Sequence, residues 1–285
     1  MTEASGQEPL AGSGRPPAMR PVIITRPLAQ AVSLQRQIAA SGREALLFPL
    51  LEIHPLDDNR VLDAALVELE RYALVAFVSP NAIDAAFARR QPWPAQVPLA
   101  VMGEGSRQAL ARHGITSSTT RIASPRDPHR TDSQTLLAAL DVAALAGREV
   151  LILRGESGRE LLGDALRSAG AIVRQVAAYR RAAPRLDAAG AQYLQQLLDR
   201  SADWIITSSE ALHVLLAMVE AADAALTPSR NGDRPGAGVV KLQQQRLIVP
   251  HVRIAETARA LGFRTVIQAA SGDEGLLAAL QFGHE

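Results

Sequence analysis

The chain has 285 residues, of which 47% are hydrophobic, enough for one large or two ordinary domains with apolar cores. Its formal net charge of +1 gives no global attraction to nucleic acid or to an anionic membrane. Cysteine is absent, which excludes disulfides, zinc–cysteine sites, iron–sulfur clusters and thiol nucleophiles. Residues 1–19 predict a disordered tail without a signal-type apolar core, and no apolar run has the about 18 residues of a membrane span. We therefore expect a cytoplasmic protein.

Short apolar runs alternate with helix-like segments, which is typical of an α/β fold with parallel sheets. In the first third of the chain we expect strands at 22–25, 74–79 and 99–102, each followed by a helix. The apolar segment 45–53 contains Pro49, which favours an edge or crossing segment over a central strand.

The middle of the chain contains its most informative stretch. After a polar loop at 117–133 and a helix from Leu136 to Gly147, the apolar run 150–153 predicts a buried strand that ends at Arg154 and Gly155. A helix and a second strand follow, the latter starting near Ile172 and leading to Tyr179. In open α/β sheets ligands bind at the carboxyl ends of strands, so this stretch predicts a binding edge.

The last third continues the alternation and repeats earlier segments. Further strands are expected at 204–208, 247–249 and 265–267, and further helices at 253–261 and 274–280. The segment 226–240 is rich in proline, glycine and asparagine and predicts a mobile loop. Residues 207–216 match 78–87, and residues 249–263 match 101–115 without a gap. Two copies of one α/β unit imply two similar domains.

Polar loops follow several predicted strands and are rich in hydroxyls, small residues and arginine. They contain Arg26, Ser79 to Asn81, Gly103 to Ser106, Arg154 to Arg159, Ser208-Ser209 and His251 to Arg253. Backbone N–H groups at helix N-termini hold anions, so these loops together indicate an anionic ligand. The alternative interpretation, that each loop is a helix cap, is the simpler one for any single loop.

Tyr179 is one of only three tyrosines and lies at a predicted strand end. A positioned tyrosine can donate a proton to a leaving hydroxyl, whereas the alternative is a packed aromatic whose hydroxyl meets a carbonyl. The six histidines have no metal-binding spacing, and GxGxxG, GxxxxGK[ST] and GxSxG are all missing. We therefore expect no metal site, nucleotide loop or nucleophile elbow.

Together these segments resemble the uroporphyrinogen-III synthase family. The resemblance extends from about Pro21 to Leu280 and rests on IITRP (23–27), FPLLEIHP (48–55), FVSPNAI (77–83), RGESGRELL (154–162), AAYRR (177–181), ITSSEAL (206–212) and RIAETARALGF (253–263). It implies two similar α/β domains with parallel sheets flanked by helices, joined by a two-stranded antiparallel β-ladder. Mapped here, domain one comprises 20–47 and 184–285, the ladder 48–55 and 176–183, and domain two 56–175.

The resemblance implies a cyclising hydro-lyase of tetrapyrrole biosynthesis that needs no cofactor and no metal. Its substrate would be hydroxymethylbilane, and its product uroporphyrinogen III, formed with inversion of ring D and loss of water. The family's tyrosine, the expected proton donor, falls on Tyr179. The expected substrate-binding residues are Arg26, Ser79, Asn81, Gly103, Ser106, Arg154, Gly155, Arg159, Ser208, Ser209 and Arg253.

The chain departs from the family at two places. Many relatives carry Gly-Pro-Thr or a serine-containing turn where this chain has His251-Val252-Arg253, and Asn81 replaces the arginine of some relatives. Arg253 would then pair with a propionate of the substrate. We expect a monomer whose contact with the preceding pathway enzyme is at most transient. The competing hypothesis is a non-catalytic two-domain binder or sensor of an anionic tetrapyrrole-like ligand.

Overall fold

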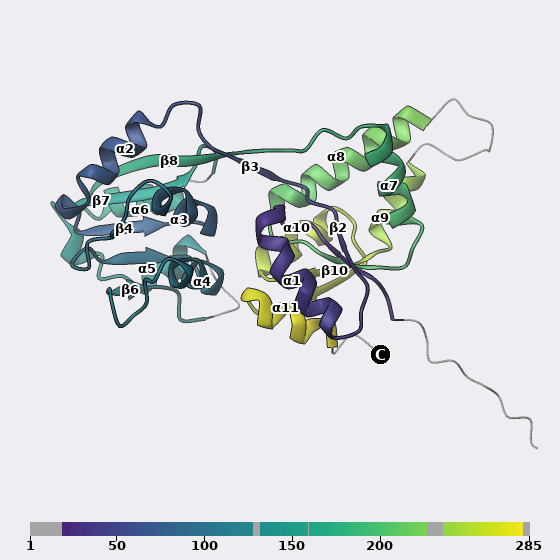
Figure 1. Ribbon diagram of the computed structural model, residues 1–285, viewed down its shortest axis with the longest axis horizontal. Helices are drawn as coiled ribbons and strands as arrows, with labels where there is room; N and C mark the ends of the chain where they lie inside the picture. Colours follow the sequence, from purple (N-terminus) through teal and green to yellow (C-terminus); the bar gives the residue numbers. More distant parts are fainter. Residues whose placement is uncertain (1–18, 128–131, 159, 227–235, 282–285) are drawn as a thin grey trace, which may run out of the picture.

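In the computed structural model of the protein, residues 19–127, 132–158, 160–226 and 236–281 are described (Figure 1). The predicted tail, Met19 excepted, and most of the expected mobile loop at 226–240 lie outside these ranges. The described chain forms two β-sheets, each flanked by helices, and we call each sheet with its helices a lobe. This confirms the predicted α/β class.

The first lobe is built on a parallel sheet of order β11-β10-β9-β1-β2. Its strands are β1 (Val22–Ile24), β2 (Ala45–Leu47), β9 (Asp203–Ile205), β10 (Arg246–Val249) and β11 (Thr265–Gln268). Its helices are α1 (Leu28–Ala40), α7 (Ala188–Leu198), α8 (Ser209–Leu226), α9 (Ala237–Gln243), α10 (Val252–Ala260) and α11 (Gly272–Gln281).

The second lobe contains a sheet of order β3-β8-β7-β4-β5-β6, in which β3 is antiparallel to β8 and the other pairs are parallel. Its strands are β3 (Glu52–His54), β4 (Leu74–Phe77), β5 (Leu99–Val101), β6 (Ile122–Ala123), β7 (Glu149–Gly155) and β8 (Ile172–Ala182). Its helices are α2 (Arg60–Val67), α3 (Pro80–Phe87), α4 (Glu104–Arg112), α5 (Ser133–Ala138) and α6 (Leu161–Ser168), with short 3₁₀ turns at Leu69–Arg71 and Ala143–Leu145.

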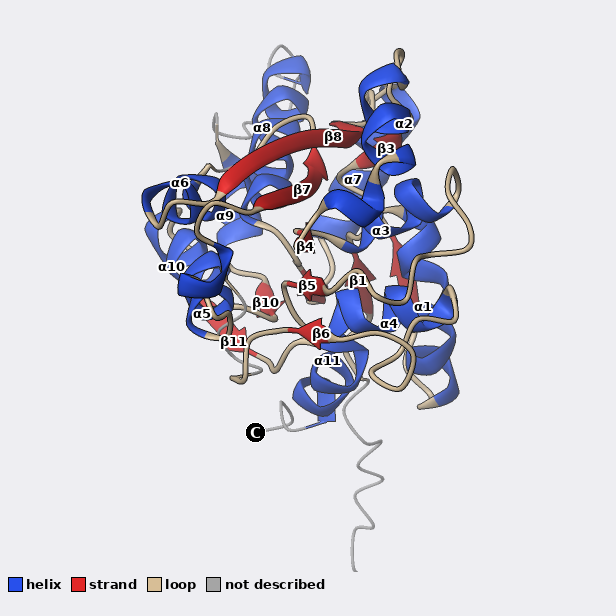
Figure 2. Cartoon of the chain, turned by 90° about the vertical axis from the view of Figure 1, so that its left-hand side faces the viewer, coloured by secondary structure: helices blue, strands red, loops and turns tan. Residues whose placement is uncertain are grey.

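The antiparallel pair β3–β8 lies where the chain passes between the lobes, and β8 is a long curved strand (Figures 1 and 2). Pairing joins 52–54 to 180–182, which is less than the expected ladder of 48–55 with 176–183. Phe48 and Leu50 instead pack in the core of the first lobe, and Pro49 between them has no N–H for a ladder. The expected domain boundaries stay a prediction, consistent with the positions of the two sheets.

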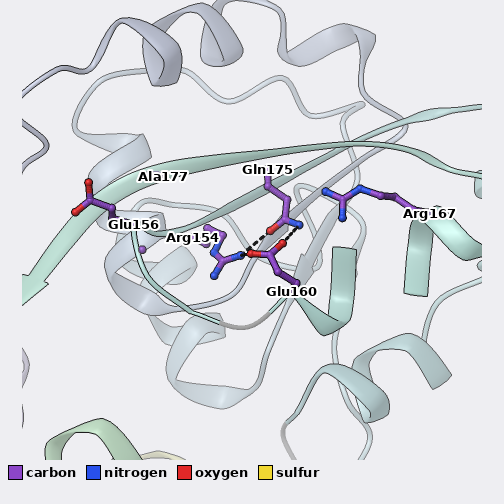
Figure 3. Close-up of a pocket in the computed structure, with 7 residues that line it drawn as sticks. Arg154, Glu156, Glu160, Arg167, Gln175 and Ala177 are labelled. Atoms are coloured by element: carbon purple, nitrogen blue, oxygen red, sulfur yellow. Dashed lines mark hydrogen bonds and ion pairs between the residues drawn. The ribbon is translucent and has the colours of Figure 1, made fainter. Parts of the chain in front are cut away.

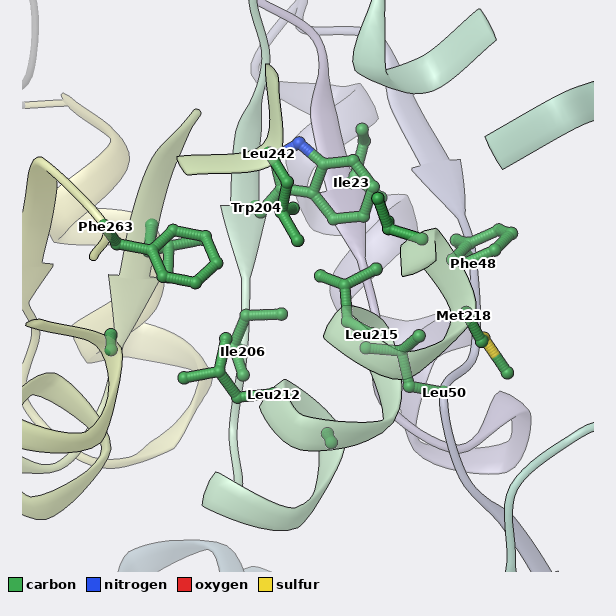
Figure 4. Packing of buried hydrophobic residues seen from close by; sticks show 14 of the residues in the cluster. Ile23, Phe48, Leu50, Trp204, Ile206, Leu212, Leu215, Met218, Leu242 and Phe263 are labelled. Atoms are coloured by element: carbon green, nitrogen blue, oxygen red, sulfur yellow. The ribbon is translucent and has the colours of Figure 1, made fainter. Parts of the chain in front are cut away.

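Both faces of each sheet carry an apolar core. In the first lobe Trp204 of β9 is fully buried and meets Phe48 edge-on, with ring centroids 6.4 Å apart (Figure 4). Strands buried on both faces explain the continuous apolar runs in the sequence, since each fully buried aliphatic side chain contributes about 1.5–3 kcal/mol.

The internal repeat corresponds to a shared topology. The matching segments 78–87 and 207–216 are the end of β4 with α3 and the loop after β9 with the start of α8, and β4 and β9 occupy equivalent places in their sheets. Segments 101–115 and 249–263 likewise contain α4 and α10. Helix α4 follows β5, the neighbour of β4, and α10 follows β10, the neighbour of β9. The order of elements therefore confirms that the two halves are built alike.

Four local predictions were wrong or incomplete. The helix expected from Leu136 to Gly147 ends at Ala138, because Asp141 accepts a hydrogen bond from the N–H of Ala144 and starts a new turn. Helix α2 was not predicted. The polar loop 117–133 contains the edge strand β6, and α9 begins within the expected loop 226–240, after Gly236 at φ 88°. Strand β6 has only two residues and shows no period of its own, whereas Leu62, Ala65 and Leu66 of α2 do lie at helical spacing.

Candidate active site

Tyr179 is buried at the carboxyl end of the parallel part of the second sheet. Its side chain is 3% exposed, and its hydroxyl lies 3.0 Å from the hydroxyl of Ser79. Ser79 is the N-cap of α3, and its Oγ accepts a hydrogen bond from the N–H of Ala82 at 3.2 Å. A Cβ added at Gly155 would lie 3.1 Å from Cζ of Tyr179. The hydroxyl end of the ring thus lies close to both Ser79 and Gly155.

A β-bulge aims the Tyr179 side chain. The register of β7 and β8 pairs Arg154 with Ala177 but Gly155 with Tyr179, so β8 carries one extra residue there. Regular alternation would place Ala178 and Tyr179 on opposite faces, yet both pack in the core on the α3 side of the sheet. The bulge therefore turns the hydroxyl toward the start of α3.

Arg154, predicted to bind substrate, is engaged within its own lobe. Its Nη1 lies 2.5 Å from Oε1 of Glu160 and donates to Oε1 of Gln175 at 2.7 Å, and Gln175 donates to the second oxygen of Glu160 (Figure 3). These side chains line a cavity of about 230 Å³ together with Gly155, Glu156, Arg167 and Ala177. Only 9% of the Arg154 side chain is exposed. Arg159, predicted beside it, lies outside the described residues.

Titration of Glu160 tests this pairing. The hydrogen bond from Arg154, followed by that from Gln175, holds the pKa of Glu160 below its ordinary value. Because the pKa is lowered, the ion pair of Glu160 with Arg154 is fully formed at pH values above the ordinary carboxyl pKa. It is lost as the pH falls through the lowered pKa of Glu160. We expect carboxyl-carbon NMR to give a low midpoint for Glu160 that rises in Arg154→Gln. An unchanged midpoint in that variant would contradict the pairing.

The lobes touch one another close to Tyr179. Two residues after Ser79, Asn81 accepts a hydrogen bond from Gln30 of α1 at 2.5 Å. Two residues after Tyr179, Arg181 forms an ion pair of 2.9 Å with Glu210 of α8. Both contacts join the second lobe or its long strand to the first lobe. The tyrosine therefore lies where the two lobes meet.

Further contacts between the lobes involve the starts of α4, α10 and α11. A Cβ built at Gly272, the first residue of α11, would lie 3.3 Å from Cγ of Glu104 at the start of α4. Burial opposes ionisation of Asp132, the N-cap of α5, but hydrogen bonds from Thr135 and the positive fields of His251 and Arg253 keep its pKa below its ordinary value. The charge of Arg253 thus acts on a residue of the opposite lobe.

The structure places the other predicted residues at helix starts. Gly103 is the N-cap of α4, and Ser106 is buried in its first turn. Ser208 accepts a hydrogen bond from the N–H of Ala211 at the start of α8, and Ser209 lies 3.2 Å from the hydroxyl of Thr257 on α10.

The predicted residues fall into separate groups. Ser79, Gly155 and Tyr179 form one cluster, whereas Arg26 is paired with Asp273 of its own lobe at 2.5 Å. Sequence reasoning did not single out Gln30, Asp132, Glu160, Gln175 and Glu210, although Glu160 lies within the segment 154–162 and Glu210 within 206–212, on which the resemblance rests. In the described ranges we find neither a group of three or more acidic or histidine residues able to hold a metal ion nor a helix able to span a membrane.

Comparison with known proteins gives a consistent result. The family model described as uroporphyrinogen-III synthase HemD matches residues 32–278. Uroporphyrinogen-III synthase of Salmonella typhimurium is 32% identical over 266 residues, 91% of this chain and 99% of that protein. The Escherichia coli enzyme of the same name is 31% identical over 268 residues, with the same coverage.

Solved structures share the fold. The uroporphyrinogen-III synthetase of Helicobacter pylori superimposes with a TM-score of 0.53 at 15% identity, covering 91% of this chain and 97% of that one. A mutant uroporphyrinogen III synthase of Thermus thermophilus gives a TM-score of 0.51 at 15% identity, covering 92% and 99%.

Proposed function

Because this chain belongs to the uroporphyrinogen-III synthase family, we propose that it cyclises hydroxymethylbilane to uroporphyrinogen III, with inversion of ring D and loss of water. It is an enzyme of tetrapyrrole biosynthesis. The observation that supports the chemistry best is the Tyr179 hydroxyl, buried where the lobes meet and held by Ser79. A tyrosine so placed is suited to act as a general acid.

In this mechanism Tyr179 donates its proton to the hydroxymethyl oxygen on ring A, and the C–O bond breaks to release water. The electron pair of the ring A pyrrole replaces that bond and leaves an electrophilic azafulvenium carbon. Ring D attacks this carbon through its substituted position, and the spiro intermediate fragments and recloses with ring D inverted. The proton that ring D finally loses as it regains aromaticity restores the tyrosine. Orientation of the two rings supplies much of the rate enhancement.

The starts of α1, α3, α4, α8, α10 and α11 supply the binding surface in this proposal. Each has a residue in its first turn that touches or faces the opposite lobe, as with Gln30, Asn81, Glu104 and Glu210. Helix N-termini carry partial positive charge and free N–H groups, which suit the eight carboxylates of the substrate. We assign Asn81, Gly103, Ser106, Ser208, Ser209 and Arg253 to this surface, with Arg26, Arg154 and Gly155 at its edges, whereas Ser79 contacts Tyr179. Arg159, which was also expected to bind substrate, lies outside the described residues.

Binding of a tetrapyrrole between the starts of these helices would require the two lobes to separate, because Gln30 contacts Asn81 and Arg181 contacts Glu210 across them. The hydrogen bond from Gln30 to Asn81 and the ion pair of Arg181 with Glu210 are polar contacts between the lobes, and the β3–β8 pair is short. A hinge at this pair is the element that absorbs such a motion.

Isomer analysis tests the proposed reaction. Fresh hydroxymethylbilane is incubated with and without the protein, and the oxidised products are separated by chromatography. We expect mostly type III isomer with the protein, because spontaneous closure leaves ring D uninverted and gives type I. Only type I, formed at the spontaneous rate, would overturn the synthase and favour the non-catalytic tetrapyrrole binder.

The enzyme is further proposed to work as a cytoplasmic monomer. Spontaneous closure of the free substrate favours rapid transfer from the preceding enzyme of the pathway, for which a transient contact suffices. Size-exclusion chromatography with light scattering, with and without that enzyme, measures both properties.

A further inference from the structure

We propose that Ser79 is a positioning residue for Tyr179 that also stabilises the tyrosine after it has given up its proton, rather than a residue that binds substrate. The inference rests on the proposed function, in which Tyr179 is the proton donor. It starts from the 3.0 Å contact between the two hydroxyls and the place of Ser79 as the N-cap of α3.

The hydrogen-bonding capacity of Ser79 fixes the direction of this contact during the reaction. Its Oγ already accepts from the N–H of Ala82, and its single O–H proton can be given to one partner. When Tyr179 directs its own proton to the leaving hydroxyl, it can no longer donate to Ser79. Ser79 must then be the donor and the Tyr179 oxygen the acceptor.

The phenolate that remains after proton transfer needs this donor. Tyr179 is 3% exposed, and among the described residues Ser79 is the one hydrogen-bond partner of its hydroxyl. A buried charge without a donor is costly, whereas a hydrogen bond to an ionised group is roughly twice as strong as a neutral one. The Ala82 N–H and the start of α3 polarise the Ser79 hydroxyl further in the favourable direction.

Gly155 leaves the space that the Tyr179 ring occupies. A methyl group there would approach Cζ of Tyr179 to 3.1 Å and its hydroxyl oxygen to 3.2 Å, so the ring would have to shift. The N–H of Glu156 donates to the carbonyl of Tyr179 at 2.8 Å and holds the bulged backbone. Glycine at this position therefore lets the ring lie where Ser79 reaches its hydroxyl.

The test compares Ser79→Ala with Ser79→Thr. We expect kcat of Ser79→Ala to fall about 10- to 10³-fold, the cost of one donor to a developing oxyanion, with KM within about threefold. Ser79→Thr keeps the hydroxyl and the cap and should restore most of kcat. Ser79→Gly serves if the alanine variant does not fold, since glycine caps a helix nearly as well but has no hydroxyl.

A second N-cap controls for the loss of helix stability. Asp187 caps α7 by accepting from the N–H of Gly190 at 2.7 Å, and no described contact links it to the site. Asp187→Ala should lower the unfolding temperature much as Ser79→Ala does, without changing kcat or the fraction of type III product. A matching loss of kcat in Asp187→Ala would show that destabilisation explains the Ser79 effect, and would overturn the proposal.

The double variant separates this inference from the proposed function. In a Tyr179→Phe background, Ser79→Ala should lower kcat no further, because Ser79 acts through the missing hydroxyl. An undiminished further loss would mean that Ser79 acts on the substrate directly, which contradicts the inference. Full activity of Tyr179→Phe with type III product would instead contradict the catalytic role of Tyr179.

Discussion

Replacement of Tyr179 by phenylalanine is expected to lower turnover by about 10- to 10⁴-fold, the range that general acids contribute. The ring should stay in place because it packs in the core of the second lobe, and Ser79 keeps its bond from Ala82. Loss of one hydrogen bond costs about 1 kcal/mol of stability, so the variant should fold. Single-turnover loss of hydroxymethylbilane, with isomer analysis, measures the effect, and type I product should increase as the spontaneous reaction competes.

Tyr72 provides a matched control for this substitution. It too is 3% exposed, and its hydroxyl accepts a hydrogen bond from Arg174 at 3.0 Å, near the other end of β8. Tyr72→Phe should therefore change stability by a similar amount and leave turnover unchanged. If Tyr179→Phe kept full turnover, Tyr179 would be only a packed aromatic, and the proton donor would have to be sought elsewhere.

Replacement of Asp203 by alanine is expected to destabilise the protein by about 3–5 kcal/mol, the cost of leaving buried charges without their partner. The Asp203 side chain is fully buried, and its two oxygens accept from Arg43 and Arg246 at 2.6 Å each. Arg43 also donates to the carbonyls of Arg20 and Leu280. The Asp203 carboxylate therefore joins β9 to Arg246 of β10. Through Arg43 it is also linked to Arg20, before β1, and to Leu280 in α11.

Urea denaturation at neutral pH measures this effect, with Asp63→Ala as the control. Asp63 pairs with Arg89 on the surface, where both side chains are well exposed, so its loss should cost no more than about 1 kcal/mol. Asp203 is the first residue of β9 and lies at the amino-terminal end of the strand, whereas the proposed site lies at the carboxyl ends. The folded Asp203→Ala protein should therefore keep its kcat. If Asp203→Ala lowered the free energy of unfolding by less than about 1 kcal/mol, the attraction between Asp203 and the two arginines would barely exceed the cost of removing these charges from water.

Much of the fold was predictable because its signals are local. Apolar runs identify β4, β7 and β10, and Ser79-Pro80 marks the start of α3 through a cap and a proline at the first helical position. The repeated segments indicated two lobes of one design. Strand β6 was missed because it is a two-residue edge strand defined by its pairing with β5. Helix α2 was missed although Leu62, Ala65 and Leu66 lie at helical spacing.

The candidate site was predictable only in part. The sequence places Tyr179 at a strand end but not on a face of the sheet, because the bulge opposite Arg154 and Gly155 reverses the alternation. It also places Arg154 at a strand end as a substrate-binding residue, but does not show that Glu160 and Gln175 accept its hydrogen bonds. Pairings of this kind depend on where side chains project after folding.

By itself, the sequence determined most of the elements and their order, because strands, helices and caps depend on residues within a few positions of one another. Its repeated segments and motifs indicated the two-lobed α/β class and the family. Only the tertiary structure decided that Ser79 meets Tyr179, that Gln30 meets Asn81, and that Asp203 joins two arginines. The first two contacts span 100 and 51 residues of chain. Such contacts follow from the packing of whole lobes, which no local pattern encodes.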